Sequence, residues 1–380
     1  MFVHSMLGKN IMKVLVIKVS SKEACGMQIR HLFAGSNSGE GFHSLFDNII
    51  GPDARRVYLL KGGPGTGKSR FMREIADSVG RGYDQELFFC SSDSQSLDAV
   101  TFPELGVALI DATAPHAQDA EWPGCRDQLL SLGDFWSRRD LEEKRAEIMA
   151  VGLIKRAYFA EAFHYFAAAN CLEQNIAARS LPRRLDCAQE LENILAQIPV
   201  KHRSCQAKPG QTRHLFASAL TPEGYVSHIK SLVGSCTALY VLTGAPGSGK
   251  SECISAIAGQ AQDAGLDMEV FHYPLNPKKL LHVLISSLKL AVLTATEFEP
   301  LDDLKVQRVA CGESLSTQGE NAGDRRLCQE LIDRGIQALK MAQASHVAVE
   351  EYYAASMDFA ALNTYRDQVL AEILSYKNFS

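Results

Sequence analysis

The chain repeats itself, and this repeat constrains its fold more than any other feature of the sequence. Residues 30–34 read RHLFA, and residues 213–217 read RHLFA again, an offset of 183 residues. At an offset of 182 residues the octet GGPGTGKS (62–69) is matched by GAPGSGKS (244–251). Matching segments at a long, nearly constant offset indicate a duplicated structural unit. We therefore expect two similar domains joined in tandem.

The length of the chain agrees with this division. At about 150 residues per domain, 380 residues favour two or three domains. We expect an N-terminal extension over 1–29, a first domain over 30–206 and a second over 207–380, because Ala207–Gly210 has the composition of a linker. The extension has no counterpart in the second half, which leaves a disordered segment, an extra edge strand and a later start at Met27 open.

Hydrophobic periodicity alternates between strand and helix in both halves. The apolar run 57–61 precedes the first octet, and apolar residues at helical spacing follow it from Lys68 to Val79. Further strands are expected at 86–90, 106–111, 268–272 and 289–294, and long helices at 137–175, 184–198, 325–343 and 346–376. Alternating strands and helices favour an α/β fold with parallel sheets. We expect two tandem P-loop NTPase domains, each followed by a helical appendage.

Both octets fit the pattern G-x-x-x-x-G-K-[ST], which is typical of phosphate-binding P-loops. Glycines let the backbone curl so that successive N–H groups converge on phosphate oxygens, and the following helix adds its positive dipole end. The residues expected to bind the nucleotide are Gly62, Gly63, Pro64, Gly65, Thr66, Gly67, Lys68 and Ser69, and Gly244, Ala245, Pro246, Gly247, Ser248, Gly249, Lys250 and Ser251.

Two kinds of side chain in the octets are expected to bind different parts of the ligand. Lys68 and Lys250 are expected to neutralise the β- and γ-phosphates, while Ser69 and Ser251 coordinate Mg²⁺. The base-recognition pattern N-K-x-D of GTPases is not found, which favours ATP. The expected ligands are therefore ATP and Mg²⁺.

Three further residues are expected to support catalysis. Asp111 ends an apolar strand, as in the Walker B pattern, and is the best candidate for the metal shell beside Ser69. Asp93 follows the strand at 86–90 and is placed to reach the metal or orient water, and His116 lies just beyond Asp111. The structural alternatives are a strand-end carboxylate, a turn or cap aspartate and a loop histidine. Asp98 is a weaker candidate.

The second half differs at these positions. Thr294 replaces Asp111 and Leu275 stands near the position of Asp93. Because a hydroxyl cannot supply charge to the metal, we expect catalysis by the first half and a regulatory or weakly active second loop. The repeated pairs Arg30-His31 and Arg213-His214 leave two interpretations, an arginine that reaches a nucleotide across the halves and a packing motif.

Composition excludes several classes of protein. The net charge is −5, so no global positive field holds nucleic acid, and nucleic-acid partners are not expected. No apolar run reaches the roughly 18–20 residues that span a bilayer. The ten cysteines form no C-x-x-C pair, and without a recognisable signal peptide they indicate reduced thiols in a cytoplasmic protein. An unknown protein partner and the oligomeric state stay open.

Taken together, RHLFAGSNSGEGFHSLFD, KGGPGTGKS, CSSDSQSLDAV and DATAPH resemble an uncharacterised bacterial family of tandem P-loop ATPases. The resemblance covers about residues 30–300 and implies a duplicated P-loop fold, ATP binding and hydrolysis, with no known substrate. Two positions depart from it, because Asn276 stands where an acidic residue is expected and Phe298 where a histidine is expected. Both departures weaken the case for catalysis by the second half.

Three functions are compatible with the sequence, while the negative net charge and the lack of helicase-like motifs argue against a fourth, a nucleic-acid motor. The first is an Mg²⁺-dependent ATPase that changes shape or drives a partner. The second is a small-molecule or nucleotide kinase, since similar loops occur in phosphotransferases. The third is a nucleotide-gated scaffold without turnover.

Overall fold

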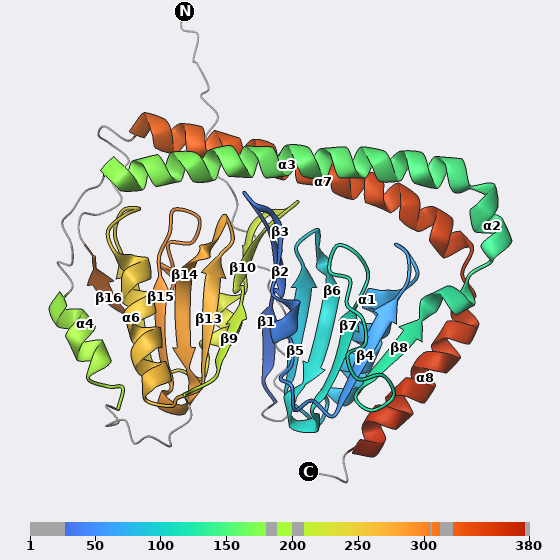
Figure 1. Ribbon diagram of the computed structural model, residues 1–380, viewed down its shortest axis with the longest axis horizontal. Coiled ribbons are helices and arrows are strands. Elements are labelled where there is room, and N and C mark those ends of the chain that lie inside the picture. The colour runs from blue at the N-terminus through green and yellow to red at the C-terminus, as the bar shows by residue number, and fades with distance from the viewer. Residues whose placement is uncertain (1–26, 180–187, 200–208, 305, 312–321, 377–380) are drawn as a thin grey trace, which may run out of the picture.

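The chain is a tandem duplication of an α/β domain. The computed structural model describes residues 27–179, 188–199, 209–304, 306–311 and 322–376. Two similar six-stranded sheets lie side by side, and two long helices run across both of them (Figure 1). Most of the expected extension over 1–29 and the boundary at 207–208 lie outside the described residues.

Each sheet is mixed, which corrects the expectation of parallel sheets. The strand orders are β1-β5-β6-β7-β4-β8 and β9-β13-β14-β15-β12-β16, and in each the third strand is antiparallel to both neighbours. The first sheet consists of β1 (Ile29–Leu32), β4 (Arg56–Lys61), β5 (Gln85–Cys90), β6 (Asp93–Phe102), β7 (Val107–Asp111) and β8 (Asp127–Ser131). The second consists of β9 (Thr212–Leu215), β12 (Ala238–Thr243), β13 (Met268–Tyr273), β14 (Asn276–Ile285), β15 (Leu290–Thr294) and β16 (Gln307–Ala310).

The antiparallel strand of each sheet, β6 or β14, was not expected and follows a tight hairpin. β6 begins with the polar residues D-S-Q-S, which resemble a loop, and only its second half is an apolar run. In the hairpin Cys90 pairs with Asp93, as Tyr273 pairs with Asn276 in the second sheet. Asn276, rather than Leu275, is therefore the counterpart of Asp93.

A helix follows the glycine-rich loop in each half and packs on one face of its sheet. The helix α1 (Lys68–Val79) buries Phe71, Met72, Ile75, Ala76 and Val79, as its periodicity predicts. The helix α6 (Lys250–Asp263) buries the corresponding apolar face. The opposite faces of the two sheets contribute to one core that both halves share, together with α5 (Ile229–Leu232).

The two halves meet through reciprocal contacts. Phe33 and Phe216 exchange backbone hydrogen bonds, each N–H donating to the carbonyl oxygen of the other at 3.0 Å. Beside them lie two hairpins, β2–β3 (Gly35–Ser38 and Gly41–Ser44) and β10–β11 (Ser218–Thr221 and Gly224–Ser227). The contact is the same from either side, as in a two-fold symmetric interface.

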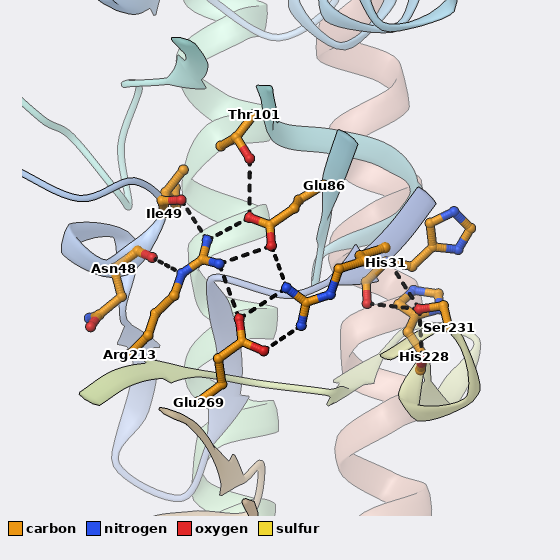
Figure 2. Close-up of polar contacts among 10 residues, drawn as sticks. His31, Asn48, Ile49, Glu86, Thr101, Arg213, His228, Ser231 and Glu269 are labelled. Atoms are coloured by element: carbon orange, nitrogen blue, oxygen red, sulfur yellow. Dashed lines mark hydrogen bonds and ion pairs between the residues drawn. The ribbon is translucent and has the colours of Figure 1, made fainter. Parts of the chain in front are cut away.

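Charged side chains extend this interface. Glu86 accepts from Arg30 at 2.6 Å and from Arg213 at 2.7 Å, and Glu269 pairs with the same two arginines (Figure 2). Burial acts to raise the pKa of Glu86, but the two arginines outweigh it and hold this pKa below its ordinary value. Both arginines lie at the starts of β1 and β9, whereas the glycine-rich loops follow the ends of β4 and β12. Their guanidinium groups thus serve the interface between the halves.

The helical tract that follows each sheet packs on the other half of the protein. The helices α3 (Arg145–Arg179) and α7 (Ala322–Ala355) pack antiparallel along their length (Figure 1). Near the middle, the Phe166 ring packs against Gly335. The remaining helices are α2 (Arg138–Glu143), α4 (Ala188–Leu195) and α8 (Phe359–Ser375). From the first half α4 packs on α6, and from the second half α8 packs on α1. Each helical tract therefore covers the sheet of the other half.

The expected break near residue 344 is absent, since α7 continues to Ala355. The chain turns instead at Ser356–Asp358, where the Asp358 carboxylate caps α8 by accepting the N–H of Ala361 at 3.0 Å. An aspartate at this position satisfies a helix N–H that has no partner within the helix. Among the described helices, none has the length and apolar character needed to cross a membrane.

Candidate functional site

The two glycine-rich loops have left-handed glycines at matching positions before their helices. In the first, Gly65 and Gly67 have φ angles of +69° and +87°, and α1 begins at the next residue, Lys68. In the second, Gly247 and Gly249 have φ angles of +86° and +93°, and α6 begins at Lys250. Only glycine adopts this left-handed region at little cost, which explains the glycine spacing seen in the sequence. Each loop leads directly into the N-terminus of a helix, where N–H groups lack intrahelical partners.

The lysine of each loop folds back on the loop itself. Lys68 Nζ donates to the carbonyl oxygens of Gly62 and Gly63, both at 2.8 Å. Lys250 Nζ makes the same contacts with Gly244 and Ala245 at 2.5 and 2.9 Å. Burial lowers the pKa of Lys250 to about 8. Each loop thus holds an ammonium group close to its backbone.

Asp111 lies beside Lys68 at the end of β7. Its Oδ2 atom is 3.6 Å from Lys68 Nζ, and its Oδ1 atom accepts the N–H of Thr113 at 2.9 Å. The position matches the sequence expectation of a carboxylate next to the first loop. The Ser69 hydroxyl, which was expected to coordinate Mg²⁺, is instead hydrogen-bonded to the protein: its oxygen accepts the N–H of Leu97 in β6 at 2.9 Å.

His116 and Asp98 complete a compact cluster with Asp111. Ligand atoms of these three side chains all lie within 4.8 Å of one another. His116 Nε2 is 3.6 Å from Asp98 Oδ1, and its ring stacks on Phe46 with ring centroids 4.4 Å apart. Burial, more than any other factor, raises the pKa of Asp98 to about 6. The sequence ranked Asp98 below Asp93, but a charged residue inside the apolar run L-D-A-V was a signal of its importance.

Asp93 lies at the first residue of β6, outside this cluster. Its two carboxylate oxygens accept the N–H of Gln95 at 3.2 Å and the hydroxyl of Ser96 at 2.6 Å. These contacts are those of a turn aspartate, which was the structural alternative. Its charge nevertheless reaches the long helices, where it raises the pKa of Glu350 in addition to the larger effect of burial.

The end of α7 covers the first loop. A Cβ atom placed on Gly65 would lie 2.4 Å from the carbonyl oxygen of Glu350, and one placed on Gly63 would lie 2.6 Å from the Tyr353 ring. The end of α3 covers the second loop in the same way, with Ala177 O at 2.4 Å from a Cβ on Gly247. Close packing therefore adds to the φ requirement for glycine at Gly65 and Gly247, whereas at Gly63 only the packing against Tyr353 favours glycine.

The long helices also bring titratable groups toward the first loop. Lys155 Nζ of α3 lies 2.6 Å from His346 Nδ1 of α7, and His346 Nε2 lies 3.5 Å from a Glu350 oxygen. Burial lowers the pKa of Lys155, and burial followed by Lys155 and Lys68 lowers the pKa of His346 to about 4. No sequence pattern points to these residues, because they lie more than 80 residues from the loop.

The second loop lines a cavity of about 270 Å³. Its charged walls include Lys279, which lies 3.6 Å from Glu173 of α3, and Arg325 of α7, which lies 3.1 Å from Glu297. Ser251 and Thr294 also line it. The volume is slightly below the roughly 300 Å³ at which ligand pockets begin, so it accommodates part of a nucleotide without rearrangement.

The described part of the second half contains no equivalent of the carboxylate cluster. Strand pairing places Leu281 at the position of Asp98 and Thr294 at that of Asp111. Glu299 follows Thr296 by three residues, as His116 follows Thr113, so it rather than Phe298 occupies the histidine position. The Thr294 hydroxyl is buried and has no hydrogen-bond partner in the described part of the chain.

Comparisons with known proteins add no relatives. No family model, no curated protein and no solved structure matches the chain. Its function is therefore inferred from its own residues.

Proposed function

We propose that the chain is an Mg²⁺-dependent ATP-binding protein with two P-loop NTPase domains, in which the first half hydrolyses ATP to ADP and phosphate. The observation that carries the proposal is the pairing of Lys68 with Asp111 at a glycine-rich loop that opens a helix. Converging N–H groups and a lysine are what a polyphosphate requires, and a neighbouring carboxylate is what its Mg²⁺ requires.

In this reaction the protein mainly positions the reacting groups and neutralises the charge of the phosphates. Phosphoryl transfer is accelerated mainly by neutralising and aligning the phosphate oxygens, which bound Mg²⁺ assists. In this proposal Lys68 leaves its carbonyl contacts for the phosphates, and the Ser69 hydroxyl turns from Leu97 toward the metal. Lys155, whose pKa is lowered mainly by burial and also by the charge of Lys68, supplies a second ammonium group from α3.

The second loop is proposed to bind ATP with little or no turnover. Lys250, Lys279 and Arg325 line its cavity, and so do Glu173, Glu252 and Glu297. Thr294 replaces the carboxylate, so no anionic side chain from β15 faces the metal position. Nucleotide bound there would stabilise the fold or regulate the first half.

Steady-state phosphate release with ATP and Mg²⁺ tests the proposal. Lys68→Ala should abolish turnover, while Lys250→Ala should retain most of it, and the exposed residue Lys144 provides a control in Lys144→Ala. Equal loss in the Lys68 and Lys250 variants would refute the asymmetry. Tight ATP binding without phosphate release in any sample would refute the stand-alone ATPase, and ADP formed only with an added acceptor would identify a kinase.

A further inference from the structure

The cluster formed by Asp98, Asp111 and His116 has the composition of a metal site. We propose that it binds a divalent transition-metal ion, of the class of Mn²⁺ and Zn²⁺, without any nucleotide. Two carboxylates and one imidazole suit such ions, whereas Mg²⁺ strongly prefers oxygen ligands. The inference does not depend on the proposed ATPase activity.

The hydrogen bonds of His116 leave its second nitrogen ready to bind a metal. Nδ1 lies 2.8 Å from the carbonyl oxygen of Asp111, and since a carbonyl only accepts, Nδ1 carries the proton. In the neutral ring Nε2 is then a bare acceptor, and it faces Asp98 Oδ1 at 3.6 Å. Metal-binding histidines have this arrangement, in which the other ring nitrogen donates to a carbonyl or carboxylate.

Two acceptors that face each other need a positive charge between them. Either a proton shared by the two side chains or a metal ion supplies it, and the surroundings of Asp98 favour the metal. Asp98 is 3% exposed, and its Oδ2 atom has no hydrogen-bond partner among the described residues, although the Cys90 thiol is close enough to affect the pKa of Asp98. A buried carboxylate with an unsatisfied oxygen is costly, and a bound cation would remove that cost.

The backbone directs Asp98 into the cluster. Phe88 pairs with Ala99 and Phe89 with Leu97, so Asp98 is the extra residue of a β-bulge. Bulges are found beside active sites, where they redirect a side chain. The bulge recurs in β14, but there the extra residue is Leu281, which cannot bind a metal.

The local charge leaves room for a divalent ion. Two carboxylates, those of Asp98 and Asp111, face one ammonium group, that of Lys68, which lies 3.6 Å from Asp111 Oδ2. Lys68 would therefore compete with the metal. Removing its charge should tighten metal binding, which an ordinary ion pair between His116 and Asp98 does not predict.

Metal titration of the full chain, stripped with a chelator and free of nucleotide, tests the proposal. Isothermal titration with Zn²⁺ and electron paramagnetic resonance with Mn²⁺ should each detect one site per chain, with Mg²⁺ at least tenfold weaker. Asp98→Asn and His116→Gln should weaken binding at least 100-fold, and Lys68→Ala should strengthen it about fivefold. His164→Gln, which changes an exposed histidine of α3, should leave it unchanged.

The metal-free stability of Asp98→Asn separates the two interpretations of the cluster. Relief of a buried charge should keep or raise its melting temperature, which also shows that the variant folds. A clear fall in the melting temperature would indicate an imidazolium–carboxylate ion pair and overturn the proposal. Absence of metal binding up to millimolar concentration, or binding that survives both ligand substitutions, would overturn it as well. Because no nucleotide is present, failure here is independent of any failure of the ATPase assay.

Discussion

The packing of α3 against α7 predicts that Gly335→Ala changes the sign of its effect on stability when Phe166 is also replaced. Gly335 lies within α7, and a Cβ atom built on it would lie 2.4, 2.7 and 2.9 Å from three atoms of the Phe166 ring. Phe166 is fully buried, so its ring has no free space to enter. Gly335→Ala therefore combines a gain of about 1 kcal/mol in helix propensity with an overpacking cost of about 1–3 kcal/mol. The net expectation is a loss of up to about 2 kcal/mol.

Removing the ring should reverse the sign. Phe166→Ala alone should cost about 3–5 kcal/mol because it leaves a cavity at the crossing. In that background the clash is gone, and Gly335→Ala should stabilise the protein by about 1 kcal/mol from helix propensity. The two substitutions should thus be coupled by about 1–3 kcal/mol.

Urea unfolding of the wild type, both single variants and the double variant, followed by circular dichroism at 222 nm, measures this coupling. Gly152→Ala in α3 is the matched control, because a Cβ there would meet nothing within 4 Å, and it should stabilise equally in both backgrounds. If Gly335→Ala has the same effect with and without Phe166, within about 0.5 kcal/mol, the packing argument is wrong.

Two further predictions concern the interface between the halves. Burial, followed by the charge of His31, lowers the pKa of His228 to about 3, so this ring stays neutral in the folded state while it protonates in the unfolded chain below about pH 6.5. The free energy of unfolding should therefore fall by up to about 3 kcal/mol between pH 6.5 and 4. His228→Phe should reduce that fall in unfolding experiments across this range. An unchanged pH slope in the variant would contradict the prediction. Glu269→Gln should cost about 2–4 kcal/mol by leaving Arg30 and Arg213 with one carboxylate, whereas Glu40→Gln, which breaks an exposed pair with Lys278, should cost less than about 1 kcal/mol. Equal melting temperatures for the two glutamine variants would refute this ranking.

Much of the fold was predictable because it is encoded locally. The repeated RHLFA and glycine-rich octets identify the duplication, and the periodicity from Lys68 to Val79 gives α1 almost residue for residue. The antiparallel strand β6 was missed because its first residues are polar and hairpin-like. The continuous helix α7 was missed because its polar and small residues near position 344 resemble a break.

The candidate site was predictable only where it follows the chain. Lys68, Asp111 and His116 come together because each stands at the end of a strand or loop at the same edge of the sheet. Asp98 depends on a bulge, whose extra residue becomes visible only when the strands are paired. Residues such as His346 and Glu350 reach the first loop only because α7 of the second half covers it, and a helix that covers its own half would have the same sequence pattern.

The reciprocal interface and the exchanged helices are what a two-fold dimer would have, here within one polypeptide. In a homodimer every substitution is present twice, so both sites must change together. A fused chain is free of this restriction, because each half has its own codons. One half can keep Asp98, Asp111 and His116 while the other carries Leu281, Thr294 and Glu299, and each still provides the helix that the other half needs as its cover.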